Sequence, residues 1–214
     1  MPRRCGRPTK SETHEESRQK IIDAAVELIS SYGAESVTIR RVCRTADLSI
    51  GTFYHYFEDK DDLMMSFLRE TTFDDFRLRT PLENIADRVS ELYMRLIRRY
   101  MELGEKFMKS FYTTGNRSLS AYMGEQDGRF AAGTVMERSE KELSSAARKG
   151  VIKSGMDIHT LCQDICTIVK GCVFEWCLND GKPDIEASVH RIVRNYLSAC
   201  LANGNEGQDE HQTD

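Results

Sequence analysis

Thiol and imidazole side chains recur on one segment near the C-terminal end of the chain. His159, Cys162 and Cys166 are spaced i, i+3 and i+7, and Cys177 projects the same way if the segment is helical. One helix face could then offer thiolates and an imidazole to a soft metal or an oxidant. Cysteine is also among the most buried residue types, and no fourth ligand is visible, so structural thiols are the stronger interpretation. We expect neither a metal nor a cofactor.

Nothing in the sequence fixes a catalytic group. The chain has seven cysteines, an odd number without the spacing of a disulfide framework or a zinc ribbon, which favours free thiols in a cytosolic protein. A cysteine–histidine nucleophile pair is chemically conceivable, but no motif places the two side chains together, and the sequence has no glycine-rich phosphate-binding loop. We therefore expect a binding protein and not an enzyme.

Charge is distributed unevenly along the 214 residues. The net charge is −4, but residues 1–44 carry nine basic and six acidic side chains, or +3, which leaves −7 for the remainder. The basic N-terminal segment could bind a polyanion, whereas the acidic remainder could not, so any polyanionic partner is expected at the N-terminal end of the chain. No targeting segment is visible, and the best apolar run, DICTIVKGCVFEW, is broken by Lys170, so we expect a cytoplasmic protein without membrane contact.

The N-terminal part of the sequence is typical of short helices. A first helix is expected over 13–32, because apolar residues recur there at three- and four-residue steps and Gly33 follows in the usual C-cap position. Thr38 is a good N-cap for a short second helix, TIRRVCRTA, and Ser49 can cap a third that runs to Phe57. The apolar positions of the first helix are Ile21, Ile22, Ala25, Val26, Leu28, Ile29 and Tyr32.

The stretch LSIGTFYHYF carries the third helix. Phe53 and Phe57 are four residues apart and Ile50 lies three before Phe53, which is helix spacing and makes a strand a weak alternative. We expect these three side chains to pack on the first two helices. Ile50 is also a candidate for contact outside the chain, so its position stays open. The outward set is then Thr52, Tyr54, His55 and Tyr56. Three short helices, the last two joined by a tight turn, are the layout of a helix-turn-helix unit.

The rest of the chain is also predicted to be helical. We find no strand pattern and no internal repeat, and the tail NEGQDEHQTD is polar and acidic. Breaks fall at Gly104, at Gly115 to Asn116, at Gly155 and at Asn179 to Pro183. After an aspartate-rich helix that Pro81 closes, the expected helices cover about 82–102, 105–114, 128–153, 157–179 and 184–202.

The run VTIRRVCRTADLSIGTFYHYFEDKDDLM resembles the signature of the TetR family of transcriptional regulators. It shares the family's threonine, the basic second helix, the apolar-x-x-Gly-Thr-aromatic-Tyr-x-Tyr/His-Phe pattern and the following x-x-Lys-x-x-Leu. The match extends without a gap over about residues 17–77. The resemblance implies an all-α fold of about nine helices. Its parts would be a flexible basic arm at 1–12, a DNA-binding domain at 13–58 with the helix-turn-helix at 38–57, an effector-binding and dimerisation domain at 59–204, and a disordered tail at 205–214.

The resemblance also places residues of the second and third helices against double-stranded DNA. Arg40 would be a candidate reader of a guanine edge. Ile50 replaces a polar residue that some members use there, which favours contact with a thymine methyl group. Tyr54, Tyr56 and Lys60 would lie on phosphates. The residues expected to face the groove are Thr38, Arg40, Ser49, Ile50, Gly51, Thr52 and His55.

The first residues of the chain form a candidate arm. Arg4 and Arg7 flank Gly6 and Pro8, and such a segment can lie flat in a narrow minor groove. A plain disordered leader is an equal alternative.

In the family, the body binds a small effector that shifts the fourth helix, so that the two DNA-reading heads no longer match the operator. Physically, such a ligand must bind the non-DNA state better. The body has enough aromatic and Met side chains for an apolar pocket, although most of them belong to the core. We expect an unknown effector that is apolar or aromatic. The candidate lining residues are Tyr93, Tyr100, Met101, Phe107, Met108, Phe111, Tyr112, Phe130, Met136 and Trp176.

The segment GCVFEWCLNDGKPDIEASVHRIVRNYL resembles the family's last two helices, which form a four-helix bundle between two subunits. The resemblance thus implies a homodimer on a near-palindromic operator, and a ligand-responsive repressor as the function. Nothing in the residues separates repression from activation, and sensing by thiols or a metal stays open. The expected interface contacts are Val169, Val173, Ile192, Val193, Tyr196 and Leu197.

Overall fold

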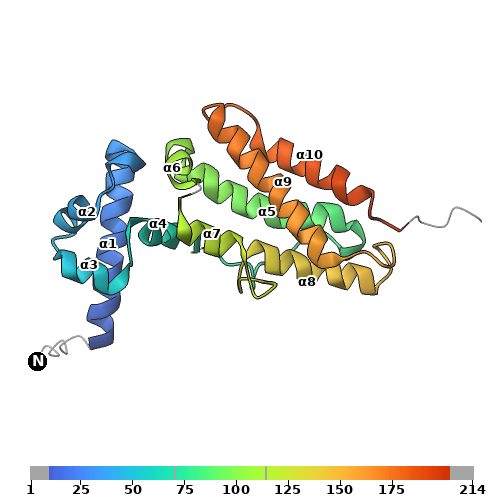
Figure 1. Ribbon diagram of the computed structural model, residues 1–214, viewed down its shortest axis with the longest axis horizontal. Coiled ribbons are helices and arrows are strands. Elements are labelled where there is room, and N and C mark those ends of the chain that lie inside the picture. Colours follow the sequence, from blue (N-terminus) through green and yellow to red (C-terminus); the bar gives the residue numbers. More distant parts are fainter. Residues whose placement is uncertain (1–9, 70, 114, 203–214) are drawn as a thin grey trace, which may run out of the picture. The chain divides into compact units, whose positions relative to one another are not determined.

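The computed structural model describes residues 10–69, 71–113 and 115–202, and these residues are mostly helical (Figure 1). The predicted all-α class is confirmed, with ten α-helices in the described residues where about nine were expected. None of these helices combines the length and apolar character needed to cross a membrane. The α-helices are α1 (Lys10–Tyr32), α2 (Ile39–Thr45), α3 (Ile50–Tyr56), α4 (Lys60–Arg69), α5 (Ile85–Leu103), α6 (Glu105–Phe111), α7 (Arg117–Met123), α8 (Val135–Arg148), α9 (Ile158–Leu178) and α10 (Ile185–Ser198). Short 3₁₀ helices η1 (Ala34–Ser36) and η2 (Leu82–Asn84) follow α1 and precede α5.

The chain divides into two compact units. Unit 1 combines the described residues up to 69 with 103–121, and unit 2 combines 71–102 with those from 122 onward. This division differs from the predicted boundary at residue 58, because α4 and α6 pack in the same unit as the three N-terminal helices. The ring of Phe67 on α4 meets that of Phe107 on α6 edge-on, with centroids 6.0 Å apart.

The core of unit 1 follows the apolar period of α1. Ile21 and Ala25 are fully buried, as that period predicts. Val26 and Tyr32 were assigned to the same face, and this was wrong, because both side chains are exposed. Tyr32 contacts the guanidinium of Arg41, which lies 4.4 Å from its ring centroid and joins the end of α1 to α2.

Unit 2 is built on a layer in which α9 contacts both α8 and α10. The aspartates before α9 and α10 cap them: Asp157 accepts from the backbone N–H of His159, and Asp184 accepts from that of Ala187. These caps fix the two helix starts within a residue of the predicted 157 and 184. The apolar faces of α8, α9 and α10 supply most of the interior of this unit.

The predicted helix over 128–153 was wrong at its start. Strand β1 (Glu125–Gln126) pairs antiparallel with β2 (Arg129–Phe130), and helix α8 begins only at residue 135. The two strands are joined by Asp127 and Gly128, both with positive φ (53° and 71°), which is the turn that Asp-Gly favours. The Asp-Gly pair was visible in the sequence, but the flanking strands are too short to show alternation. Thr134 then caps α8 by accepting from the backbone N–H of Glu137.

Helix α7 was not predicted. Its cap is Asn116, a buried amide whose Oδ1 accepts from the backbone N–H of Leu119 at 2.9 Å and whose Nδ2 donates to the carbonyl of Phe111 at 3.1 Å. Gly115 and Asn116 were read only as a break between helices. The same asparagine both ends one helical segment and starts the next.

Candidate nucleic-acid interface

The turn between α2 and α3 is fixed by local hydrogen bonds. Thr38 caps α2, its Oγ1 accepting from the backbone N–H of Arg41 at 3.3 Å. After α2, Asp47 adopts a positive φ of 54°, and the backbone N–H of Leu48 donates back to the carbonyl of Cys43 at 2.9 Å. This left-handed residue reverses the chain within a few positions and sets the start of α3.

Ser49 and Gly51 form the exposed start of α3. Ser49 Oγ accepts from the backbone N–H of Thr52 at 3.0 Å and lies 2.8 Å from the Thr52 hydroxyl. A side chain at Gly51 would meet nothing within its own chain closer than Ser49 Oγ at 3.7 Å. Internal packing therefore does not require glycine at this position, and the missing side chain leaves room for an outside partner.

The aromatic residues of α3 divide between core and surface as the helical spacing predicts. Phe53 and Phe57 are buried, with ring centroids 5.6 Å apart. Tyr54 is 57% exposed. The sequence left two alternatives for Ile50, packing in the core or contact outside the chain. Its side chain is 44% exposed, so it contributes little to the core. The outer face of α3 thus presents an isoleucine, a tyrosine hydroxyl and His55.

Sequence reasoning missed one residue of this surface. His14, on the first turns of α1, places its Nε2 3.2 Å from Nε2 of His55. Its ring also meets that of Tyr56 edge-on, with centroids 4.6 Å apart. The pair is separated by 41 residues in sequence. No local pattern could have indicated this contact, because it depends on how α1 crosses α3.

The basic residues near α3 differ in exposure and in their contacts within the chain. Arg40 is exposed, whereas Arg41 is held on the ring of Tyr32. Lys60 opens α4 and is partly exposed. Arg4 and Arg7 of the predicted arm lie outside the described residues, as does the predicted tail.

This geometry agrees with the comparison of the sequence with known families. Residues 21–66, from α1 to α4, match the family described as "Bacterial regulatory proteins, tetR family". The KstR repressor of Mycolicibacterium smegmatis is 41% identical over 58 residues. Helices α1 to α4 are thus similar to the DNA-binding segment of TetR-family transcriptional regulators. The helix-turn-helix of this chain is therefore a DNA-binding element, with α3 in the position of the recognition helix.

Other matches extend over most of the chain. The "Fatty acid metabolism regulator protein" of Bacillus subtilis is 25% identical over 194 residues, covering 84% of this chain and 93% of that protein. The structure of Thermus thermophilus FadR, a TetR-family repressor in complex with lauroyl-CoA, aligns with a TM-score of 0.60 at 14% identity, over 90% of this chain and all of that one. The KstR match covers only 28% of that repressor. The chain thus shares its fold with the Thermus repressor.

The predicted pocket residues are divided between the two units. Phe107, Met108, Phe111 and Tyr112 belong to unit 1. In unit 2, Met101 is exposed and so does not line the interior, and Phe130 stacks on His159. Trp176 donates from Nε1 to the carbonyl of Gly181 at 3.0 Å, which fixes the loop after α9. Only Tyr93, Tyr100 and Met136 of the predicted set are fully buried in unit 2.

His159, Cys162 and Cys166 do not form a metal site. Within the described residues, no group of three His, Cys, Asp or Glu side chains is arranged to hold a metal ion. His159 lies between two carboxylates, with Nδ1 2.7 Å from Glu140 and Nε2 3.3 Å from Glu125. Burial raises the pKa of the Cys162 and Cys166 thiols, so little thiolate is available to an oxidant.

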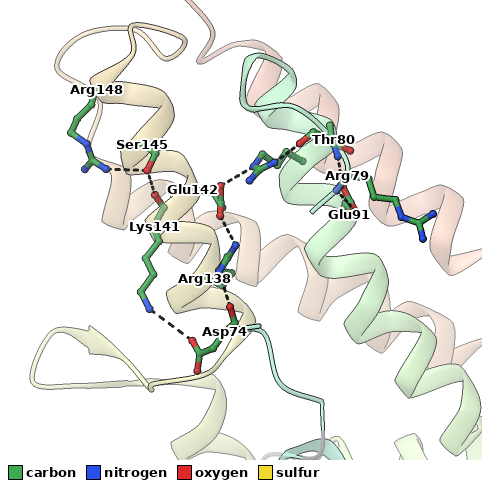
Figure 2. A network of polar contacts seen from close by, with 10 residues as sticks. Asp74, Arg79, Thr80, Glu91, Arg138, Lys141, Glu142, Ser145 and Arg148 are labelled. Carbon is green, nitrogen blue, oxygen red and sulfur yellow. Dashed lines mark hydrogen bonds and ion pairs between the residues drawn. The ribbon is translucent and has the colours of Figure 1, made fainter. Parts of the chain in front are cut away.

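A polar network holds the segment that follows α4 in unit 2 (Figure 2). Glu142 on α8 is almost buried and accepts from Arg88 of α5 at 2.7 Å and from Arg138 at 2.9 Å. Arg138 also donates to the carbonyl of Asp74 at 3.0 Å, and Arg88 donates to that of Thr80. The segment between the DNA-binding unit and α5 is therefore tied to both α5 and α8.

The predicted dimer contacts need correction. Val169, Val173, Val193 and Leu197 are buried against their own chain, so they cannot lose further surface to a second copy. Ile192 and Tyr196 are partly exposed. The apolar side chains that α9 does expose are Phe174 and Leu178, at 55% and 60%. Helical spacing puts these two on the side opposite the buried valines, a signal that was available in the sequence and was overlooked.

Proposed function

We propose that the protein is a homodimeric repressor that binds a near-palindromic operator and releases it when a small apolar effector binds its body. The observation that carries the proposal is the outer face of α3, where Ile50 and Tyr54 are exposed beside a glycine that internal packing does not need. It lies in the segment that matches the TetR family. Binding to chromosomal DNA would place the protein in the cytoplasm.

The DNA contacts follow from exposure. Ile50 and Thr52 are proposed to face bases, with the isoleucine against a thymine methyl group. Arg40 is proposed to read a guanine edge. Thr38, Ser49, Gly51, Tyr54, Tyr56 and Lys60 are proposed to hold the duplex, chiefly through its phosphates.

A second copy would cover the exposed stripe of α9. Phe174 and Leu178 lie one turn apart, and Gly171 on the same side has open space at its Cβ position. Large exposed apolar side chains at helical spacing are typical of an interface. Ile192 and Tyr196 of α10 are partly exposed as well, and α9 and α10 would pair with their equivalents across a twofold axis.

The interior of unit 2 offers polar anchors for an effector. Ser90 and Tyr93 on α5 and Ser139 on α8 are fully buried, and their hydroxyls make no hydrogen bond within the described residues. Ser139 lies near the Tyr93 hydroxyl without reaching hydrogen-bond geometry. A buried hydroxyl without a partner costs about 1–3 kcal/mol. Burial raises the pKa of Tyr93, so it stays a neutral donor.

These anchors favour an effector with a long apolar part and a neutral carbonyl or hydroxyl group. Acyl thioesters have this chemistry, and both the Bacillus relative and the Thermus structure are associated with fatty acids by name. The test is the affinity of the protein for a duplex recovered by selection, measured with increasing lauroyl-CoA. A decrease in DNA affinity supports the proposal. Unchanged DNA affinity with lauroyl-CoA, free laurate and dodecanol would remove this effector class.

A further inference from the structure

The start of α1 contributes an imidazole to the face of α3 that carries His55. His14 Nε2 and His55 Nε2 are 3.2 Å apart, within hydrogen-bond distance. The two rings meet edge-on with centroids 5.1 Å apart, and Tyr56 closes the cluster with edge-on contacts to both. His55 is exposed, and it shares a helix face with Gly51 and Thr52 at i−4 and i−3. The cluster therefore orients an imidazole on the DNA-reading surface.

The distance restricts the protonation of the pair. A neutral imidazole has one donor nitrogen and one acceptor nitrogen, whereas an imidazolium donates from both. One Nε2 must carry the hydrogen and the other must accept it. The contact is therefore compatible with two neutral rings or with one imidazolium that donates to one neutral ring. Two imidazolium rings would point their N–H groups at each other.

Few other charged groups face this pair. Helix α3 has no carboxylate, and its remaining titratable groups are the hydroxyls of Tyr54 and Tyr56. On α1, Glu15 and Glu16 follow His14 and are exposed, and Arg18 forms an ion pair with Glu15 at 3.7 Å. Neither imidazole is paired with a carboxylate among the described residues. DNA phosphates would then be the strongest charges near His55 in the complex.

We propose that His14 is a positioning residue for DNA recognition, and that the His14–His55 pair takes up a proton when the protein binds DNA. Phosphates stabilise the imidazolium form of His55. Neutral His14 accepts the Nε2–H of that imidazolium in a charge-assisted hydrogen bond, which leaves Nδ1–H of His55 free to donate to a DNA oxygen. The inference rests on the DNA-binding function and adds proton-linked binding to it.

The test is the affinity of the full-length protein for its selected duplex between about pH 6 and about pH 8 at constant salt. Wild-type affinity should fall as the pH rises. His14→Phe keeps an aromatic ring against Tyr56 but cannot accept a hydrogen bond. Its affinity near about pH 7 should be roughly three- to tenfold lower, and its decline should begin at lower pH. His14→Gln retains an acceptor oxygen and should restore most of the affinity.

Three results would overturn the proposal. The first is that His14→Phe binds DNA with the same affinity and the same pH dependence as wild type. The second is an equal loss of affinity at every pH in both His14 variants, which is what a merely structural role would give. The third concerns the free protein: if the ring resonances of His55 and Tyr56 at one pH are the same in wild type and His14→Phe, the pair does not exist. If wild type selects no duplex at all, the proposed function fails instead, and the spectrum of the free protein still tests the pair.

Discussion

At the scale of single residues, substitution of the exposed Arg40 tests whether this side chain contacts a base or a phosphate. Arg40→Ala should lower affinity for the best duplex roughly 10- to 100-fold and relax the preference at one base position. The measurement is a binding profile over all single substitutions of that duplex. Arg191→Ala, which removes an exposed arginine from α10, is the matched control and should leave the profile unchanged. Equal weakening on all duplexes would assign Arg40 to phosphates instead.

Ser49 combines a cap with a proposed DNA contact, and two substitutions separate these roles. Ser49→Ala removes the acceptor for the backbone N–H of Thr52 and should lower the free energy of unfolding by about 1 kcal/mol. Ser49→Asp keeps a capping oxygen but adds a negative charge next to the phosphates. It should therefore unfold like wild type in urea and bind DNA at least tenfold more weakly. Unimpaired DNA binding by Ser49→Asp would remove Ser49 from the interface.

Residue-level prediction succeeded where one helix decides the answer. Phe53 and Phe57 were assigned to the core and Tyr54 to the surface from their spacing alone, and their burial agrees. Ile50 could not be assigned, because it sits at the edge of the buried face, where packing against another helix decides exposure. The contact of His14 with His55 depends on the crossing of two helices and is not encoded in any local pattern.

At the scale of elements, the β1–β2 hairpin is attached to α8 and α9 through one titratable contact. His159 stacks on Phe130 with ring centroids 4.6 Å apart and lies between Glu140 and Glu125. Hydrogen bonds that His159 donates to these carboxylates, with Glu140 the larger cause, raise the pKa of His159. Protonated His159 therefore stabilises the folded state. This stabilisation is fully present below the pKa of the unfolded chain, about 6.5, and is lost as the pH rises through the higher pKa of the folded state.

The free energy of unfolding should therefore decline above about pH 6.5 by an amount below about 1 kcal/mol, since the site is largely solvated. His159→Gln should remove this decline, and His190→Gln on α10 should keep it. Urea unfolding at several pH values measures the difference. A decline of the same size in His159→Gln would show that another group is responsible.

Prediction from sequence failed for the short elements, the β1–β2 hairpin and helix α7. The hairpin has two residues per strand, and α7 has seven, so neither shows a period that could be recognised. The starts of α9 and α10 were predicted to within one residue, because Asp157 and Asp184 cap these helices. The starts of α1 and α5 were predicted at 13 and 82 and lie three residues away, at Lys10 and Ile85.

At the scale of the whole molecule, the outer stripe of α9 is proposed to hold two copies together. Phe174→Asp combined with Leu178→Asp should convert the dimer to a monomer at micromolar concentration, because each subunit would bury two carboxylates, four in all, at the twofold axis. Light scattering gives the mass directly. Met156→Asp, at a partly exposed methionine before α9, is the control and should remain dimeric. A dimer that survives the double substitution would place the interface elsewhere.

The same scale shows why sequence alone could not separate core from surface on α9. The family resemblance points to α9 and α10 as the helices of the proposed interface, but both faces of α9 are apolar in sequence. Val169 and Val173 complete the chain's own core, and only the fold distinguishes them from Phe174 and Leu178.

The most direct test of the central claim is selection of bound duplexes by the full-length protein from a random pool. We predict one enriched sequence with two inverted half-sites whose centres are about one helical turn of DNA, or a multiple of it, apart. The Arg40→Ala variant should lose the preference at one position in each half-site. Enrichment of a sequence without inverted symmetry, or of no sequence at all, would contradict a dimeric operator-binding regulator.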